Sequence, residues 1–295
     1  MGGLVMRLNG VNSLPVTPFT PDGELDEKSM RRLVDHVIDG GVASVIGLGR
    51  VGEVTYLTME ERERVIATVT DQVAGRVPVG FGCIDLTFKE GITIARLASE
   101  AGADFMMSRG PTDGDVTEYY RRLAEIIPVV VYDLGVQKEM SIADDIVPLV
   151  EETKNIVGLK ISGAQEKVIE AKQLLNISVL CGHDVMSMVS YQMGADGVSS
   201  GCSMLLPSEE VRLYKLVTEK RWDEARDLFY SKLLPIMNYL PGGPGMMGWS
   251  VCKNILCWEG IIDSPYVRPP SLSAGVARLE EARHVWDTIR AQAVA

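Results

Sequence analysis

One lysine near the end of a short apolar segment is the residue of this sequence best suited to chemistry. The segment runs from Asn155 to Gly163 (Asn-Ile-Val-Gly-Leu-Lys-Ile-Ser-Gly), and its branched apolar side chains favour a strand. Continuous hydrophobicity is typical of a parallel strand covered on both faces, where Lys160 would be partly desolvated and its uncharged amine favoured. A free amine attacks ketones and forms a Schiff base, so Lys160 is a candidate catalytic residue. The alternative is a lysine at a strand end that faces solvent or a carboxylate.

Tyr132 ends the preceding apolar run, which reads Val-Val-Val-Tyr from Val129. On a neighbouring strand its phenol could relay protons to or from a substrate bound to Lys160. Alternatively, the tyrosine fills space and satisfies its hydroxyl on the backbone.

A glycine-rich turn offers a site for a carboxylate. It reads Gly-Leu-Gly-Arg-Val-Gly-Glu from Gly47 to Glu53. Glycines let backbone N–H groups approach a ligand, and successive N–H groups form an anion nest, so Gly49, Arg50 and Val51 are candidate substrate-binding residues. Arg50 and Arg109 follow different apolar runs, and either guanidinium could pair with a carboxylate, or be solvated or hold a loop instead.

Two further candidates come from the last apolar runs. His183 would need several more ligands to hold a metal, and Glu53, Asp133 and Asp184 are widely spread in the sequence. We therefore expect neither a metal nor another cofactor. Ser199 ends the eighth run and is a candidate substrate-binding residue, while the segment 197–201 could alternatively cradle a phosphate.

The elements that would position these residues alternate regularly. Eight apolar runs recur at intervals of about 20 to 35 residues, the size of a strand–helix unit. They cover residues 14–19, 43–48, 77–83, 105–108, 129–132, 156–160, 179–181 and 197–200. This pattern predicts a closed (β/α)8 barrel (TIM barrel), with the site at the carboxyl ends of its strands. The competing fold is an open doubly wound sheet, which the lack of a Gly-x-Gly-x-x-Gly motif disfavours.

Helix signals support the same interpretation. Thr58 and Thr87 each precede a glutamate by three residues in a capping-box pattern, and Asp26 is a candidate cap of the first helix. Ser141 could begin another helix, with a kink or late start at Pro148. After Pro207 strand signals stop, and helices are predicted over 208–240, 249–260 and 271–295. We expect the barrel over residues 1–206, and a barrel-closing helix with a C-terminal helical extension over 207–295.

Composition excludes some functions. The 295 residues carry a formal net charge of −11, which argues against nucleic-acid binding. The five cysteines are scattered without zinc spacing and read as reduced thiols. No apolar run approaches membrane-spanning length, and residues 1–7 lack a signal-peptide pattern. These features predict a cytoplasmic protein that does not bind membranes.

The motifs resemble the dihydrodipicolinate synthase / N-acetylneuraminate lyase family. Residues 14–19 are similar to its first strand, and the turn from Gly49 through Glu53 is similar to its Gly-Thr/Ser-Thr-Gly-Glu turn. Tyr132-Asp133 stands where the family has Tyr-Asn, and Gly158-Leu-Lys160 matches its Gly-Ile-Lys. The resemblance implies a (β/α)8 barrel with C-terminal helices, commonly a homotetramer, whose lysine condenses with pyruvate or another 2-oxo acid. The tyrosine would be the proton relay, and the turn would hold the substrate carboxylate.

The sequence departs from that family where the second substrate is selected. Arg50 and Val51 replace the two hydroxyl residues of the turn, and only the backbone N–H of Val51 could still serve. The tyrosine pair expected after the fourth strand is missing at 108–112, and Gln137 aligns with the family's arginine. We therefore expect a cofactor-free lyase acting on a small 2-oxo acid, by aldol cleavage, condensation or dehydration, with altered specificity. The alternatives are a phosphate-binding barrel enzyme and a catalytically silent relative, and we expect a homo-oligomer, tetramer or dimer.

Overall fold

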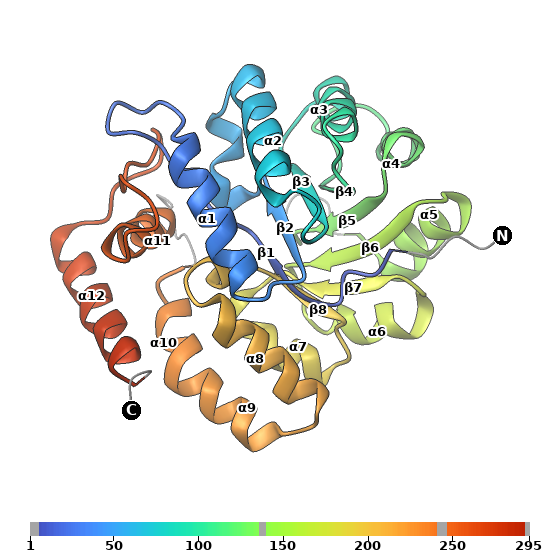
Figure 1. The fold of residues 1–295 in the computed structure, drawn as a ribbon. Helices are drawn as coiled ribbons and strands as arrows, with labels where there is room; N and C mark the ends of the chain where they lie inside the picture. The colour runs from blue at the N-terminus through green and yellow to red at the C-terminus, as the bar shows by residue number, and fades with distance from the viewer. Residues whose placement is uncertain (1–5, 136–139, 241–246, 293–295) are drawn as a thin grey trace.

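Eight parallel strands close into a barrel in the computed structural model, which describes residues 6–135, 140–240 and 247–292. Each strand pairs with the next along the chain, and β8 returns to β1 (Figure 1). The strands are β1 (Gly10–Ser13), β2 (Ser44–Gly47), β3 (Val79–Cys83), β4 (Phe105–Ser108), β5 (Val129–Asp133), β6 (Ile156–Ile161), β7 (Ser178–Cys181) and β8 (Gly197–Ser200). The predicted (β/α)8 barrel is confirmed, and the open doubly wound sheet is wrong.

Helices cover the outside of the barrel, as the alternating pattern predicts. They are α1 (Glu27–Asp39), α2 (Met59–Val73), α3 (Phe88–Glu100), α4 (Val116–Ile126), α5 (Val147–Glu152), α6 (Lys167–Leu174), α7 (Ser187–Gln192) and α8 (Pro207–Thr218). Both predicted capping boxes form, at Thr58 and Thr87, and the Asp26 carboxylate caps α1 by accepting from Ser29 N. Helix α5 begins late: a π-helical turn over Ile142–Ile146 follows Ser141, and Pro148 lies in the first turn of α5. Side-chain caps therefore fix the starts of α1, α2 and α3.

The first strand lies earlier in the chain than predicted. Residues 14–19 are not a strand; β1 is Gly10–Ser13, which pairs with β2 and β8. Pro15 and Pro18 have no N–H group for a strand ladder, so the apolar run cannot continue the pairing. The true strand carries polar Asn12, which is buried and donates to Val198 O at 3.1 Å while its Oδ1 accepts from Ser44 Oγ at 2.7 Å.

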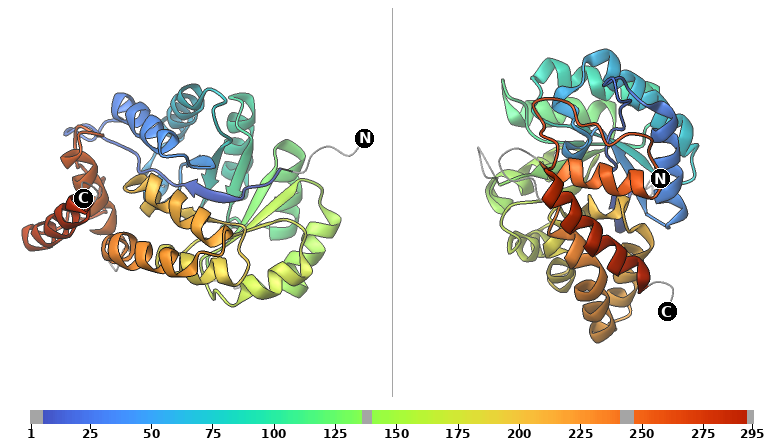
Figure 2. Two further views of the ribbon diagram at one scale, coloured as in Figure 1. Left: turned by 60° about the horizontal axis from the view of Figure 1, so that its bottom comes forward. Right: turned by 90° about the vertical axis from the view of Figure 1, so that its left-hand side faces the viewer.

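Beyond α8 the described chain is helical but interrupted. It forms α9 (Trp222–Leu228), a π-helical turn (Phe229–Leu233), α10 (Leu234–Met237), α11 (Met247–Trp258) and α12 (Val276–Ala291). The single helix predicted over 208–240 is broken between α8 and α9, where Lys220 adopts a left-handed conformation with φ 60°. Helix α12 packs on α10 and α11 outside the barrel, as both views of Figure 2 show. None of the described helices combines the length and apolar character needed to cross a membrane.

Candidate active site

Adjacent strands place the two predicted catalytic residues side by side. Tyr132 on β5 and Lys160 on β6 are partners in the strand register, near the carboxyl ends of both strands. Lys160 Nζ lies 4.3 Å from the centroid of the Tyr132 ring. Both side chains are buried, with residue exposures of 4% for Lys160 and 6% for Tyr132. The Tyr132 ring therefore lies beside the Lys160 amine at the mouth of the barrel.

A cavity of about 250 Å³ opens at this end of the barrel, and Lys160 and Tyr132 line it. Its other polar lining residues are Arg50, Ser162, His183, Asp184, Ser199 and Cys252. Its apolar lining includes Leu14, Val51, Ile84, Leu134, Val185, Met204, Leu240 and Trp249. Such a concave site with a few convergent polar groups is what a small ligand requires.

The glycine-rich turn forms one wall of this cavity. Residues Arg50–Gly52 form a short 3-10 turn, and both Arg50 and Val51 line the cavity. The N–H groups of Gly52 and Glu53 are used within the turn, where they donate to Gly49 O (3.0 Å) and Arg50 O (3.1 Å). Arg50 and Val51 open the turn, and the first N–H groups of a helical turn have no partner within it. The turn therefore presents backbone donors suited to an anion.

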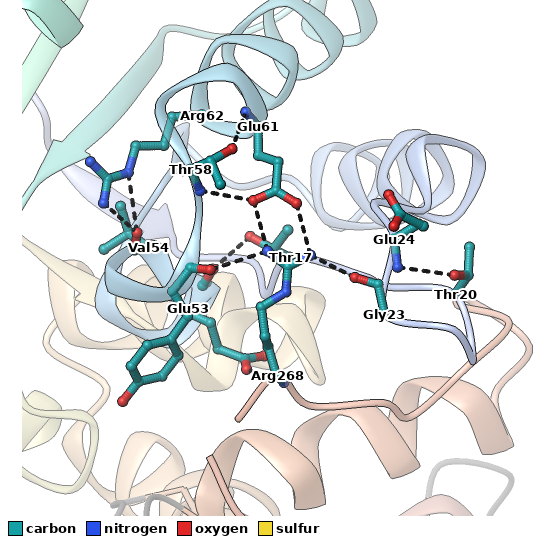
Figure 3. Close-up of polar contacts among 12 residues, drawn as sticks. Thr17, Thr20, Gly23, Glu24, Glu53, Val54, Thr58, Glu61, Arg62 and Arg268 are labelled. Carbon is teal, nitrogen blue, oxygen red and sulfur yellow. Dashed lines mark hydrogen bonds and ion pairs between the residues drawn. The ribbon is translucent and has the colours of Figure 1, made fainter. Parts of the chain in front are cut away.

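Buried charges hold the turn from behind. Glu53 adopts a left-handed conformation with φ 55°, and its carboxylate pairs with Lys253 of α11 and accepts from Arg268 N at 2.8 Å. The Arg268 guanidinium in turn pairs with Glu61 at 2.7 and 2.8 Å (Figure 3). Thr17 Oγ1 donates to Gly52 O at 2.7 Å. The C-terminal extension thus contributes directly to the position of the cavity wall.

Lys253 is a second buried lysine, but it occupies a different environment. Burial lowers its pKa to about 8, against the opposing effect of Glu53. Its Nζ also donates to Tyr266 O at 2.9 Å and lies 4.3 Å from the centroid of the Phe19 ring. The amine of Lys253 is engaged in contacts that hold the fold, whereas Lys160 faces the cavity.

Only some of the other predicted substrate-binding residues line the cavity that contains Lys160. Ser199 is buried on β8 and lines the cavity, and the exposed side chain of Arg50 lies at its rim. Gly49 precedes the 3-10 turn without lining the cavity. Arg109 forms an ion pair with Asp85 at 2.7 Å and lines a neighbouring cavity of about 350 Å³, which shares Tyr132 and Leu134 with the first. Gln137 lies outside the described residues.

Sequence reasoning missed the contribution of the C-terminal helices. Trp249 and Cys252 of α11 line the cavity, although the tryptophans are easily interpreted as packing residues. Burial raises the pKa of the Cys252 thiol to about 12, so this thiol is not an activated nucleophile. Residues so far from Lys160 in sequence have no local signal that connects them with it.

Comparison with known proteins agrees with this geometry. The model of the dihydrodipicolinate synthetase family matches residues 7–290. The chain belongs to this family. It is 30% identical over 243 residues to the 4-hydroxy-tetrahydrodipicolinate synthase of Methanococcus vannielii, covering 79% of this chain and 83% of that protein. It is 33% identical over 233 residues to the synthase of Geotalea daltonii, covering 76% and 80%.

Solved structures agree with the family assignment. The dihydrodipicolinate synthase of Rhodopseudomonas palustris is 27% identical, with a TM-score of 0.87 over 97% of this chain and 100% of that one. The 4-hydroxy-tetrahydrodipicolinate synthase of Methylacidiphilum fumariolicum SolV has a TM-score of 0.88 over 98% of both chains at 24% identity, which shows the shared fold. As a member of this family, the protein is a class I lyase of the Schiff-base type.

Proposed function

We propose that this lyase condenses a 2-oxo acid of the pyruvate type with Lys160. The supporting observation is the state of the lysine: its amine reaches the cavity beside Tyr132, and no carboxylate in the described part of the chain forms an ion pair with it. A silent relative would be expected to hold this lysine in such a pair. An amine that faces the cavity and is not held by a carboxylate can reach the carbonyl carbon of a bound 2-oxo acid.

The proposed chemistry follows from the groups around the amine. Lys160 Nζ attacks the ketone carbon, and water leaves as the imine forms. The protonated imine withdraws electrons, so in aldol cleavage the C–C bond one carbon away breaks and its electron pair leaves an enamine on the lysine. In dehydration, the carbon next to the imine first loses a proton to form the enamine, which then expels the hydroxyl group of the next carbon as water and leaves an unsaturated imine. Tyr132 carries the proton that leaves or reaches the substrate hydroxyl. The N–H groups of Arg50 and Val51 hold the 2-oxo acid's carboxylate, with Gly49 permitting its approach. Ser199 lines the same cavity from β8 and is proposed as a further substrate contact.

The second substrate differs, we propose, from that of the synthases that this chain resembles. Arg50 stands at the rim of the lysine cavity, and Arg109 lines the cavity on the other side of Tyr132. Two guanidinium groups at these places favour a substrate with a second acidic group, a dicarboxylate or a sugar acid. Gln137, which aligns with the family's arginine, is proposed as a further substrate contact.

The phosphate-binding alternative has less support. After β8 the N–H of Cys202 donates to Asp184 Oδ1 at 3.0 Å, and that of Ser203 to Ser200 Oγ at 3.2 Å. These two donors, which directly follow the segment 197–201, are therefore engaged by the protein itself. We further propose a cytoplasmic homo-oligomer, a tetramer or a dimer, on the family resemblance, and light scattering in solution measures which of the two forms.

Borohydride trapping tests the proposed function. Incubation with pyruvate and borohydride should add one reduced pyruvate adduct to the intact mass of the wild-type protein. Lys160→Arg keeps the positive charge but should gain no adduct. A wild-type protein that stays unlabelled with pyruvate and with larger 2-oxo acids would contradict the proposal.

A further inference from the structure

A buried carboxyl group lies behind the cavity wall and takes no part in the chemistry described so far. Glu210 is on α8, is fully buried, and approaches Ser200 at the end of β8, with 3.3 Å between Glu210 Oε1 and Ser200 Oγ. Ser200 Oγ in turn donates to Asp184 Oδ1 at 2.7 Å. Asp184 lines the cavity that contains Lys160. A serine hydroxyl thus bridges two carboxyl groups, one inside the protein and one at the cavity wall.

Counting protons favours a protonated carboxyl group at Glu210. The Ser200 hydroxyl has a single hydrogen, and the shorter contact assigns it to Asp184. Ser200 Oγ already accepts from Ser203 N at 3.2 Å. The contact between Ser200 Oγ and Glu210 Oε1 is therefore a hydrogen bond only if Glu210 carries a proton and donates it. Were Glu210 charged, two acceptors would face each other in a dry interior.

The surroundings of Glu210 favour the protonated form. No cation in the described ranges forms an ion pair with Glu210 or Asp184, and Glu210 Oε2 has no hydrogen-bond partner. The titratable groups that face it are Asp184, the Cys202 thiol and the Tyr191 hydroxyl, none of which is positively charged. Burial, with the charge of Asp184, raises the pKa of Glu210 to about 8.

Asp184 is held in one orientation by two hydrogen bonds. Its Oδ1 accepts from both Ser200 Oγ (2.7 Å) and Cys202 N (3.0 Å). Two hydrogen bonds to one oxygen restrict rotation of the Asp184 carboxyl group. The Ser200 hydroxyl can donate its single hydrogen to Asp184 only while Glu210 does not also require a donor.

We propose that Glu210 is a positioning residue: while it carries a proton it donates to Ser200, and Ser200 then donates to Asp184 and fixes that carboxyl group at the wall of the lysine cavity. When Glu210 loses that proton, Ser200 must serve two carboxylates, and a second negative charge appears behind the wall. The cavity then repels acidic substrates, and Asp184 is free to turn. The expected effect of Glu210 on turnover rests on the proposed function. The protonation of Glu210 does not, because it can be measured without any substrate.

The test compares wild type with Glu210→Gln, in which a neutral amide of the same shape donates to Ser200 at every pH. In wild type, kcat/KM for the 2-oxo acid substrate should fall about tenfold one pH unit above the pKa of Glu210, where about nine-tenths of the group is ionised. In Glu210→Gln that alkaline loss should be absent, with kcat/KM near neutral pH within about threefold of wild type. Ser200→Ala should also change the profile, since it removes the bridge while leaving both carboxyl groups. Glu209→Gln, the partly exposed neighbour, is the matched control and should follow wild type.

Infrared difference spectroscopy supplies a second reading without any substrate. The wild-type protein should show a protonated carboxyl band at neutral pH that disappears at alkaline pH, and Glu210→Gln should lack that band. Identical bands and identical pH profiles in wild type and Glu210→Gln would overturn the inference. If the protein forms no imine at all, the proposed function fails, while the infrared result still decides the protonation of Glu210.

Discussion

Gly182 lies directly against the side chain of Lys160. A methyl group at position 182 would stand 2.5 Å from Lys160 Cε and 2.1 Å from Ser162 Oγ, both closer than real contacts allow. The missing side chain therefore sets the path of the lysine stem from β6 into the cavity.

The Gly182→Ala variant should displace the amine without removing it. We expect the rate of imine formation to fall at least about tenfold, since a shift of about 1 Å in a reacting group costs that much or more. Gly201→Ala is the control, because its methyl meets Val51 Cγ1 at an ordinary 3.5 Å. Borohydride trapping over time measures both variants, with circular dichroism to verify folding. Equal rates in the two would show that Gly182 does not position Lys160.

The two arginines should contribute differently to acidic substrates. Arg50 lies at the rim of the lysine cavity, whereas Arg109 reaches a substrate only past Tyr132 and is already paired with Asp85. Arg50→Ala should raise KM for a dicarboxylate or sugar acid by about tenfold or more, and Arg109→Ala should have a smaller effect. Trapping with pyruvate alone should change little in either variant. Unchanged turnover of every acidic substrate in both variants would contradict the assignment of these arginines.

The buried pair of Glu53 and Lys253 should govern stability. Both side chains are fully buried, and removing one partner leaves an uncompensated charge. Lys253→Met should lower the free energy of unfolding by about 3–5 kcal/mol. Arg64→Ala, which breaks the exposed pair with Glu27, should cost at most about 1 kcal/mol. Urea unfolding measures both, and a small loss in Lys253→Met would mean that the pair is not needed to hold the turn.

Glu210 should also make stability depend on pH in a defined direction. Its pKa in the folded protein, about 8, is above the ordinary 4.5, so the folded state keeps a proton that the unfolded state releases between these values. The free energy of unfolding should therefore fall as the pH rises through this range, and level off above it. The fall should be smaller in Glu210→Gln. Parallel curves of unfolding free energy against pH for the two proteins would rule out a raised pKa.

Local patterns in the sequence predicted most of the fold. Capping boxes at Thr58 and Thr87 and apolar runs from β2 to β8 are local signals, and the structure confirms them. The first strand was misplaced because β1 is short and carries a buried asparagine, while the apolar run after it contains two prolines that cannot pair. A buried polar residue satisfied inside the barrel looks like a surface residue in sequence.

The site was predictable only in part. Lys160 and Tyr132 end adjacent strands, and strand order alone brings them together. The pairing of Glu53 with Lys253 joins residues 200 positions apart, and no local pattern reports such a contact. Glu210 likewise belongs to an ordinary helix, and only the packing of α8 on the end of β8 shows that its carboxyl group is buried.

The most direct measurement is the location of the trapped adduct. Among the residues that the structure describes, two lysines are buried: Lys160 faces the cavity, while Lys253 is engaged by Glu53 and Tyr266 O. After treatment with pyruvate and borohydride, peptide mapping by mass spectrometry should find the reduced adduct on the peptide that contains Lys160. An adduct on Lys253, on surface lysines without preference, or on no lysine would contradict the assignment of Lys160 as the Schiff-base residue.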